Sequence, residues 1–322
     1  MTPDIIGPEA EAHLDWLALT EALAAGHRLP RAEIGDTFLY RRDDTLLSRS
    51  AWIDGLGMAV KTATIFPGNP VSGRPIVNGG LSLYSDTDGT LEALVDFHLV
   101  TRWKTAGDSL LAACRLARPD SRAITIVGAG SVARSMILAY ASAFEGARFT
   151  VWNRTGAAAL ALAADLPDVI ATDDLEGAVR GADIIATATM SREPLIRGDW
   201  LRPGQHLDLI GAYRPDMREV DDACLARARV FVDSLATTVD HIGELKIPLA
   251  SGAITRADIL ADYYDLATGR FARRSVDEIT ICKNGGGAHL DLMTARYILA
   301  AWRGRAVSGS KKRLDQDGYS KG

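Results

Sequence analysis

The stretch that decides the fold is Ile124-Thr125-Ile126-Val127-Gly128-Ala129-Gly130-Ser131-Val132-Ala133. It places GxGxxA directly after an apolar run and directly before a helical stretch, the context in which this motif binds a dinucleotide. Gly128 permits the tight turn, Gly130 lets the backbone approach a pyrophosphate, and Ala133 keeps the helix close to the sheet. The helix N-terminus offers N–H groups to the phosphates. The predicted phosphate-binding residues are Gly128, Ala129, Gly130, Ser131 and Val132.

Around this loop, residues 119–287 alternate between short apolar runs and helical segments. Strands are predicted at 123–127, 149–152, 169–171, 184–188, 206–210, 230–232 and 279–283, and helices at 131–143, 156–164, 175–181 and 222–228. Such alternation is typical of parallel strands joined by crossover helices. The segment is therefore predicted to be an α/β, Rossmann-type domain with a doubly wound parallel sheet.

The flanking segments follow another pattern. Residues 1–118 carry predicted strands at 37–40, 58–66, 76–84 and 91–97, and predicted helices at 8–25 and 102–117. Short turns join these strands, which favours a mostly antiparallel sheet. Residues 288–322 begin with a predicted helix at 288–302 and end in a polar, basic tail from Ser308 that we expect to be flexible.

The strand after the glycine loop ends in Val151-Trp152-Asn153-Arg154-Thr155. An NAD-binding domain usually carries an acid here, which holds the ribose 2′-hydroxyl. Asn153, Arg154 and Thr155 instead offer donors and a positive charge, which suit a 2′-phosphate. NADP(H) is therefore the predicted cofactor, with NAD(H) as the alternative. The end of the strand predicted at 184–188 is expected to lie beside the ribose and nicotinamide of the cofactor. Its residues there are Thr187, Ala188 and Thr189.

Composition and charge narrow the class of partner. The 322 residues are 47% hydrophobic and 24% charged, as in folded globular proteins, and the net charge is −5 at pH 7. An acidic chain is unsuited to binding nucleic acid or an anionic membrane, so we expect a small-molecule partner. No apolar run of about 18 residues occurs, and acids stand where a signal peptide has a basic region, which predicts a cytoplasmic protein.

No metal or disulfide site is predicted. Cys114, Cys224 and Cys282 lie far apart without CxxC spacing, so we expect three buried thiols. The six histidines show no HxH or HxxxH spacing. His241 is a titratable candidate for catalysis, and we expect it to lie in a loop.

A series of motifs in a fixed order extends over residues 29–300. They are Lys61 with Phe66-Pro67-Gly68-Asn69, Asp88-Gly89-Thr90-Leu91-Glu92-Ala93-Leu94, Thr101-Arg102-Trp103-Lys104-Thr105-Ala106, the glycine loop, Pro203-Gly204, Gly211-Ala212 with Pro215-Asp216-Met217 and Glu219, Val232-Asp233, and Asp277-Glu278-Ile279-Thr280 leading to Lys283 and Asp291. In these motifs the chain resembles the ornithine cyclodeaminase and mu-crystallin family. The resemblance implies a Rossmann domain (119–287) inserted in a second, α+β domain (1–118 and 288–322) that binds substrate and pairs two subunits into a homodimer.

The resemblance also implies how substrate is held. Family members bind the carboxylate of a small amino or imino acid through an arginine, a lysine and a second arginine, and by motif these positions are Arg31, Lys61 and Lys104. The alternatives to Arg31 are the nearby arginines Arg28, Arg41, Arg42 and Arg49. Lys104 keeps the charge of the usual arginine but lacks its bidentate fork. Ile76 stands where the family often has threonine, and an apolar wall suits a compact ring better than a charged amine.

One departure from the family pattern concerns the reaction. Members that release ammonia from ornithine resemble one another in an aspartate just after the strand at 206–210, where this chain has Ala212 and Tyr213. The leading hypothesis is an NADPH-dependent reductase that converts 1-pyrroline-2-carboxylate or 1-piperideine-2-carboxylate to L-proline or L-pipecolate. Ornithine cyclodeaminase, an amino-acid dehydrogenase such as alanine dehydrogenase, and a non-catalytic binding protein like mu-crystallin are the alternatives.

Reduction of an imine also needs a proton for its nitrogen. Lys61 is the predicted catalytic residue and is one source of this proton. A water held by Asp233, which we also place among the cofactor-binding residues, is the other source. The sequence does not decide between them.

Overall fold

The computed structural model describes residues 2–317, and the chain divides into two compact units. One unit combines the chain up to Lys104 with the chain from Ala288 onwards, and the other is Thr105–Gly287. The second unit is therefore inserted into the first. The division falls within helix α2 (Phe97–Leu116), whereas the predicted boundary at residue 118 lies just past the end of that helix.

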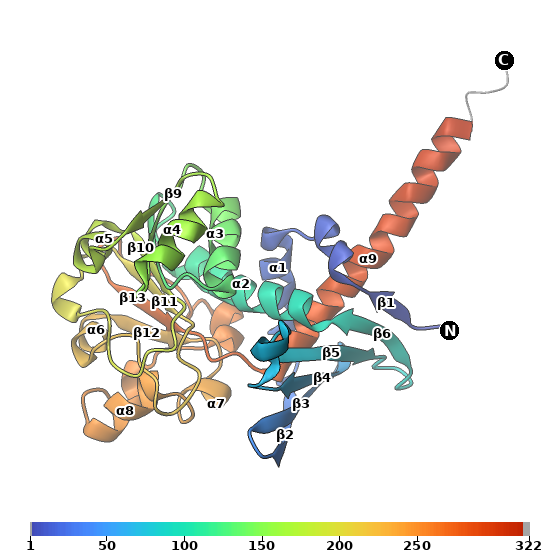
Figure 1. The fold of residues 1–322 in the computed structure, drawn as a ribbon, viewed down its shortest axis with the longest axis horizontal. Coiled ribbons are helices and arrows are strands. Elements are labelled where there is room, and N and C mark those ends of the chain that lie inside the picture. Colours follow the sequence, from blue (N-terminus) through green and yellow to red (C-terminus); the bar gives the residue numbers. More distant parts are fainter. Residues whose placement is uncertain (1, 318–322) are drawn as a thin grey trace. The chain divides into compact units, whose positions relative to one another are not determined.

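The inserted unit is built on a seven-stranded parallel sheet with the order β12-β13-β11-β10-β7-β8-β9 (Figure 1). Its strands are β7 (Ala123–Val127), β8 (Arg148–Trp152), β9 (Val169–Thr172), β10 (Ile184–Thr187), β11 (His206–Leu209), β12 (Arg229–Val232) and β13 (Thr280–Lys283). Its helices are α3 (Ser131–Ala143), α4 (Gly156–Ala164), α5 (Leu175–Gly181), α6 (Asp222–Arg227), α7 (Leu235–Thr238) and α8 (Gly243–Ser251), with 3₁₀ turns η3 (Gly198–Trp200), η4 (Arg256–Asp258) and η5 (Tyr263–Thr268). The order reverses between β7 and β10, so the predicted doubly wound α/β fold is confirmed.

The strands of this sheet lie deep in the core. Every residue of β10, β11 and β13 is buried. This is the pattern of a parallel sheet covered on both faces, and it explains the continuous apolar runs in the sequence. Because these runs are sharply bounded, the predicted strand limits agree with the structure to within one residue.

The first unit is built on a six-stranded sheet with the order β1-β6-β5-β4-β3-β2. Its strands are β1 (Asp4–Ile6), β2 (Glu33–Arg41), β3 (Asp44–Ile53), β4 (Gly57–Ile65), β5 (Val77–Tyr84) and β6 (Leu91–Asp96). Neighbours pair antiparallel, except that β1 is parallel to β6. Helices α1 (Trp16–Gly26) and α9 (Ala288–Asp317) pack on each other, and α9 also contacts β3 and β4 (Figure 1). Two 3₁₀ turns complete the unit, η1 (Pro8–His13) and η2 (Asn69–Ser72).

Some elements of this unit differ from the prediction. Strands β1 and β3 were not predicted, because β1 has only three residues and Ser48-Arg49-Ser50 interrupts the apolar pattern of β3. Helix α2 begins at Phe97, before the predicted start at 102, because the Asp96 carboxylate accepts from Leu99 N at 2.7 Å and caps it.

Three further expectations need correction. The helix predicted over 8–25 is η1 followed by α1. The C-terminal helix α9 continues to Asp317, so the predicted flexible tail from Ser308 is helical that far, and residues 318–322 lie outside the described residues. Cys114 is exposed, whereas Cys224 and Cys282 are buried as expected.

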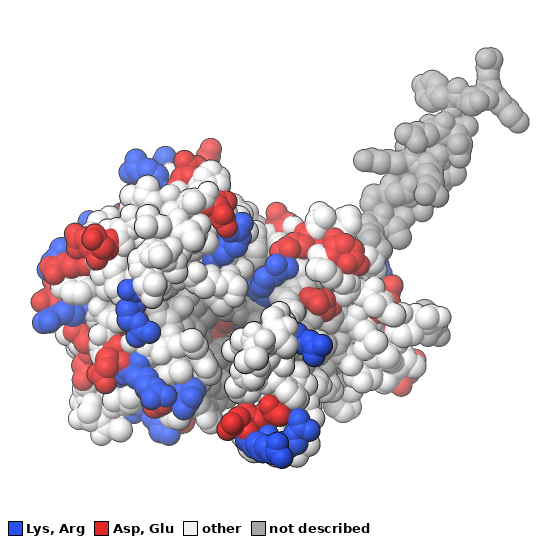
Figure 2. All heavy atoms as spheres, viewed as in Figure 1, with Lys and Arg blue, Asp and Glu red and all other residues white. Residues whose placement is uncertain are grey.

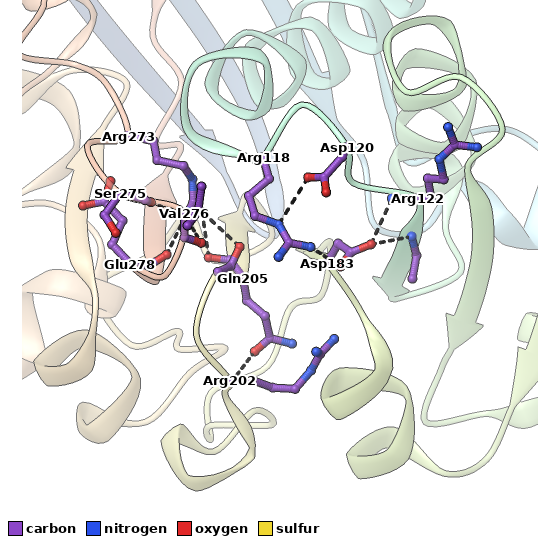
Figure 3. A network of polar contacts seen from close by, with 12 residues as sticks. Arg118, Asp120, Arg122, Asp183, Arg202, Gln205, Arg273, Ser275, Val276 and Glu278 are labelled. Atoms are coloured by element: carbon purple, nitrogen blue, oxygen red, sulfur yellow. Dashed lines mark hydrogen bonds and ion pairs between the residues drawn. The ribbon is translucent and has the colours of Figure 1, made fainter.

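The amino-terminal edge of the parallel sheet is held by Arg273 (Figure 3). Its Nε donates to Leu116 O at 2.6 Å, and its Nη atoms donate to the carbonyl oxygens of Gly204, Gln205 and Glu278 at 3.2, 3.2 and 2.6 Å. One guanidinium thus ties the end of α2 to the segments that enter β11 and β13.

A second anchor on this edge is Asp183, just before β10 (Figure 3). Its Oδ1 lies 2.9 Å from Arg118 Nη2, and its Oδ2 accepts from the backbone N–H groups of Arg122 and Ala123 at 2.9 and 3.0 Å. Although burial opposes it, the backbone donors and Arg118 lower the pKa of Asp183. The starts of β7 and β10 are therefore fixed to each other.

Candidate active site

A cavity of about 290 Å³ lies where β7, β8 and β10 end, at the carboxyl-terminal edge of the parallel sheet. Ligands of open α/β sheets bind at this edge, where the strand order reverses. The predicted cofactor residues that line it are Gly128, Ala129, Gly130, Asn153, Arg154, Thr155, Ala188 and Thr189. The lining residues that were not predicted are Trp152, Met190, Ser191 and Leu195. These four residues lie close in sequence to predicted ones, and this proximity is the only sequence signal that could have identified them.

The glycine loop has the geometry that a dinucleotide needs. Gly128 has φ +119°, a conformation that favours glycine, and a Cβ there would collide with the carbonyl oxygen of Ala188. At Gly130 a Cβ would meet nothing within 4 Å, so its backbone faces open space. Gly130 is the N-cap of α3, and no side chain of the described residues caps that helix. The N–H groups of its first turn are therefore open to an anion, and the loop fits a pyrophosphate.

The loop after β8 forms another wall of the cavity. Arg154 and Thr155 are exposed, and Asn153 donates from Nδ2 to Thr155 O at 3.0 Å. Among the described residues that line the cavity, Arg154 alone carries a charge, and none is acidic. The cavity therefore offers a cation, and no carboxylate, to whatever group lies beside this loop.

Glu219 organises the turns behind the cavity. Its carboxylate is fully buried and accepts five hydrogen bonds. Oε1 accepts from the N–H and hydroxyl of Thr189 at 2.8 and 2.7 Å. Oε2 accepts from the Thr187 hydroxyl at 2.7 Å and from the N–H groups of Gly211 and Ala212 at 2.8 and 3.2 Å. One carboxylate thus fixes the turns after β10 and β11, and Thr189 connects it to the cavity wall.

A second buried carboxylate, Glu244, supports Glu219. It accepts from the backbone N–H groups of Glu219 and Val220 at 2.7 and 3.1 Å. Burial and the charge of Glu219 raise the pKa of Glu244 to about 7, and the positive charge of Lys283 opposes this rise. Lys283 is buried on β13 and donates to two backbone carbonyls at 2.7 and 3.0 Å, and burial lowers its pKa.

Asp233 does not line the cavity. Its buried carboxylate accepts from the Thr238 hydroxyl at 2.6 Å and from the N–H groups of Ser234, Gly285 and Gly286 at 2.8, 2.9 and 2.6 Å. Burial raises the pKa of Asp233, and these hydrogen bonds oppose the rise. Because the chain itself occupies both carboxylate oxygens, Asp233 fixes the segment after β13. The other predicted cofactor residues outside the cavity lining are Ser131, Val132 and Thr187.

In the other unit, Lys61 and Asp291 form a buried ion pair. Lys61 Nζ lies 2.9 Å from Asp291 Oδ1, and the two side chains are 9% and 3% exposed. Nζ also lies 4.8 Å from the centroid of the Phe97 ring. Burial lowers the pKa of Lys61, and Asp291 opposes this shift. Although burial acts the other way, Lys61 and Lys104 lower the pKa of Asp291.

Lys104 and His289 belong to the same charged cluster. Lys104 is half-buried on α2, and within the described residues no hydrogen bond or ion pair reaches its ammonium group. His289 was not predicted. It is buried, neither ring nitrogen has a partner among the described residues, and burial together with His27 and Lys104 lowers its pKa to about 3. Its imidazole is therefore neutral at physiological pH.

The structure does not bring Ile76 to this cluster. Phe66 N donates to Ile76 O at 2.8 Å, which extends the β4–β5 pairing and puts Ile76 out of phase with Lys61. Ile76 is 43% exposed, and Arg31 is exposed just before β2. The roles of both residues stay predictions. His241 lies exposed in the turn between α7 and α8, a loop position as expected.

The loop after β11 carries no acid at the positions weighed for ornithine chemistry. Ala212 is buried and its N–H donates to Glu219, while Tyr213 is 58% exposed. Asp216, farther along, is paired with Arg192 and Arg214 at 3.2 and 3.1 Å. A substrate amine finds no carboxylate on residues 210–215.

Figure 2 shows Lys and Arg interspersed with Asp and Glu over the face in view. In residues 2–317 no helix is long and apolar enough to cross a membrane. The same residues hold no group of three or more His, Cys, Asp and Glu side chains arranged to bind a metal ion.

Comparison with known proteins identifies similar chains. The model of the ornithine cyclodeaminase/mu-crystallin family matches residues 51–306. The Delta(1)-pyrroline-2-carboxylate reductase of Paracoccus denitrificans is 52% identical over 302 residues, which are 92% of this chain and 96% of that protein.

Two solved structures extend the comparison to the fold. An archaeal alanine dehydrogenase dimer with bound NAD has a TM-score of 0.85 at 26% identity, covering 95% of this chain and 98% of its own. The Thermococcus litoralis Delta(1)-pyrroline-2-carboxylate reductase, in complex with NADH and L-proline, also has a TM-score of 0.85, over 94% of this chain and 98% of its own. At 24% identity the latter supports the fold alone.

Proposed function

The chain belongs to the ornithine cyclodeaminase/mu-crystallin family, and we propose that it is an NADPH-dependent reductase of small cyclic imino acids. The substrate is 1-pyrroline-2-carboxylate or 1-piperideine-2-carboxylate, and the product is L-proline or L-pipecolate. In the reaction a hydride adds to the imine carbon, the π electrons of the C=N bond move to nitrogen, and nitrogen takes a proton. The observation that carries the proposal is the 52% identity, over 92% of the chain, to a Delta(1)-pyrroline-2-carboxylate reductase.

We assign substrate binding to the Lys61 cluster, which consists of Lys61, Asp291, Lys104 and His289. The ammonium groups of Lys61 and Lys104, with the Arg31 guanidinium that the family pattern adds, neutralise and orient the substrate carboxylate. The bound cofactor supplies the hydride. Lys61 is the favoured proton source, because burial lowers its pKa and the Asp233 carboxylate is already saturated by the chain. Asp291 holds the Lys61 ammonium in place.

Lys61 itself is tested by substitution. Lys61→Met should lower kcat/KM by at least about 100-fold, because it removes a carboxylate contact and a proton donor together. Lys61→Arg keeps the ion pair with Asp291 and should retain binding better than turnover. Full turnover by Lys61→Met would remove Lys61 from the mechanism.

The preference for NADPH is assigned to Arg154. A guanidinium on a cavity wall without carboxylates suits a 2′-phosphate and gives a ribose 2′-hydroxyl no carboxylate acceptor. Arg154→Ala should lower kcat/KM for NADPH by about 10- to 100-fold and leave that for NADH nearly unchanged. Arg148→Ala, at the exposed start of β8, is the matched control. An unchanged NADPH/NADH ratio in Arg154→Ala would refute this role.

The reaction is tested with two assays run side by side. We expect rapid NADPH oxidation with 1-pyrroline-2-carboxylate, and no ammonia from L-ornithine without added reductant. Ammonia release with an idle imine assay would make the protein an ornithine cyclodeaminase. NADH-dependent amination of pyruvate would make it an alanine dehydrogenase, and inactivity in all three assays would favour a binding protein.

A homodimer is proposed through the outer face of the six-stranded sheet. This face exposes apolar side chains from several strands, among them Leu39, Leu46, Trp52 and Leu94. Large exposed apolar areas mark protein interfaces. Light scattering should give twice the chain mass for the wild type and the chain mass for a Leu46→Asp/Leu94→Asp variant. A wild-type monomer would contradict the proposal.

A further inference from the structure

Two segments of the chain connect the inserted unit to the other unit. The first is helix α2, which is unbroken and passes from one unit to the other between Lys104 and Thr105. The second is the segment between β13 and α9, which leaves the inserted unit after Gly287. Each segment leads to a residue of the Lys61 cluster, α2 to Lys104 and the second segment to Asp291 in the first turn of α9.

A buried clamp, which consists of Asp108, Tyr263 and Asn284, ties these two segments to each other inside the inserted unit. Asp108 lies one turn along α2 from Lys104, and its side chain is fully buried. Its Oδ1 accepts from the Tyr263 hydroxyl and from Asn284 Nδ2, each at 2.9 Å. The Tyr263 hydroxyl also lies 2.6 Å from the backbone carbonyl oxygen of Asp108. Because Asn284 directly follows β13, a side chain of α2 is bound by the segment that leads to α9.

Both partners of Asp108 are themselves held in place. Tyr263 is the first residue of η5, and its ring centroid lies 5.0 Å from that of Phe271. Burial raises the pKa of Tyr263, so its hydroxyl keeps the proton that it donates. The backbone N–H of Asn284 donates to Leu209 O at 3.1 Å, which fixes it to the end of β11. The clamp therefore joins α2 to well-held parts of the inserted unit.

Beyond the clamp, the second segment consists of glycine. Residues 285–287 are three glycines, and Gly286 has φ +71°, a conformation that favours glycine. A run of glycines is intrinsically free to bend, because it has no side chains that restrict the backbone. The hydrogen bonds that limit this freedom come from the Asn284 side chain and from Asp233, which accepts from the N–H groups of Gly285 and Gly286. The direction in which the chain continues to α9 therefore depends on these bonds.

We propose that Asp108 is a positioning residue for imine reduction: by holding both connecting segments, the clamp keeps Lys104 and Asp291 in the geometry that hydride transfer to the bound imino acid requires. This inference rests on the proposed function. A displacement of the reacting atoms by about 1 Å can cost about 100-fold in rate, so a residue remote from the chemistry can control it. Asp108, Tyr263 and Asn284 do not stand among the residues to which the family pattern assigns a role.

The test is the rate constant of a single hydride transfer. Enzyme in excess over NADPH is mixed rapidly with saturating 1-pyrroline-2-carboxylate, and the loss of NADPH absorbance gives a rate constant and an amplitude. A variant that is only less folded loses amplitude and keeps the rate constant, whereas a positioning defect lowers the rate constant itself.

The variants remove the two donors of the clamp. Tyr263→Phe removes the hydroxyl and keeps the ring, and Asn284→Leu removes the amide at similar size. We expect each to lower the rate constant by about threefold to tenfold, and the double variant to lower it by about 10- to 100-fold. The Kd for NADPH should stay within about twofold of the wild type, because no clamp residue lines the cofactor cavity.

Two comparisons separate positioning from a merely structural role. Asp108→Asn keeps an oxygen acceptor and should retain more of the rate constant than Asp108→Leu. Tyr140→Phe is the matched control, because Tyr140 is also fully buried in the inserted unit and donates to a carboxylate, that of Asp208, but lies on α3, which connects no units. Tyr140→Phe should lower stability and leave the rate constant unchanged.

Each outcome decides the proposal. A rate constant of the double variant within about twofold of the wild type would overturn it, as would an equal loss in Tyr140→Phe. If the double variant does not fold, Tyr263→Phe and Asn284→Leu alone give the same comparison. If the wild type reduces no imine, the proposed function fails, and the variants are compared in whichever of the pyruvate and ornithine assays is active. Inactivity in all three assays removes the hydride transfer that the clamp serves and overturns this inference as well.

Discussion

The two edges of the seven-stranded sheet differ in the charge of the side chains that make most contacts with the backbone, with Asp183 at one edge and Lys283 at the other as exceptions. At the amino-terminal edge, the guanidinium of Arg273 donates to backbone carbonyls, including that of Leu116 at the end of α2. At the carboxyl-terminal edge, the carboxylates of Glu219, Glu244 and Asp233 accept from backbone N–H groups. The difference follows from the polarity of the peptide chain.

Helices that lead into parallel strands end near the amino-terminal edge, and their last carbonyls have no partner within the helix. Arg202 and Gln205 illustrate this as Arg273 does, because both donate to Ala182 O just after α5, at 2.9 Å each. At the opposite edge, turns and helix N-termini present N–H groups. Buried carboxylates satisfy some of these groups, and those beside the glycine loop are left for a ligand. One edge is thus closed by the chain, and the other is completed by a cofactor.

The first way to break this comparison is to remove the acceptor at the ligand-binding edge. Glu219→Gln places an amide NH₂ among five donors, so we expect unfolding free energy to fall by about 3 kcal/mol and KM for NADPH to rise at least about tenfold. Chemical denaturation and steady-state kinetics measure the two effects. Glu193→Gln, an exposed acid in the loop after β10, is the control and should change neither. A normal KM with lowered stability would limit Glu219 to a structural role.

At the amino-terminal edge, a substitution should lower stability without changing cofactor or substrate binding. Arg273→Met removes the donors of several backbone carbonyls, and we expect a loss of about 2–4 kcal/mol in unfolding free energy. KM for NADPH and for the imine should stay unchanged in the folded fraction. Arg256→Met, which breaks an exposed ion pair with Asp240, should cost less than about 1 kcal/mol. A change in cofactor KM for Arg273→Met would show that the two edges are energetically coupled.

Local sequence signals predicted the glycine loop and the strands of the parallel sheet better than the side chains that fix its turns. The glycine loop and the strands of the parallel sheet were predicted closely, because GxGxxA and short apolar runs are local patterns. Glu219 belongs to a predicted motif, but its role depends on Thr187 and Gly211, which come together only when β10 pairs with β11. Long-range pairing of this kind leaves no periodic trace in the sequence.

The substrate cluster shows the same limit. Lys61 and Lys104 were found through family motifs, and the motif residue Asp291 proved to be the partner of Lys61. Arg49 was one of several arginines weighed against Arg31, and the sequence could not single it out, because the register that sets it opposite Lys61 is a tertiary property. His289 was missed because a single histidine in an apolar helix carries no spacing signal.

The last test of the comparison between the two sheet edges is the pH dependence of the unfolding free energy. Glu244 has a pKa of about 7 in the folded protein, above the ordinary value of 4.5, so the folded state binds a proton more tightly than the unfolded chain. The stability that this proton contributes is present at low pH and is lost as pH rises from about 4.5 to about 7, by as much as about 3 kcal/mol. Glu244→Gln removes the titrating group, so its unfolding free energy should depend less on pH across this range. Urea unfolding at about pH 5 and about pH 8 measures the difference, with Glu193→Gln expected to follow the wild type. An equal pH dependence in Glu244→Gln would mean that another group dominates, whereas a flattened one would assign the pH sensitivity to the edge where buried carboxylates meet the cofactor loops.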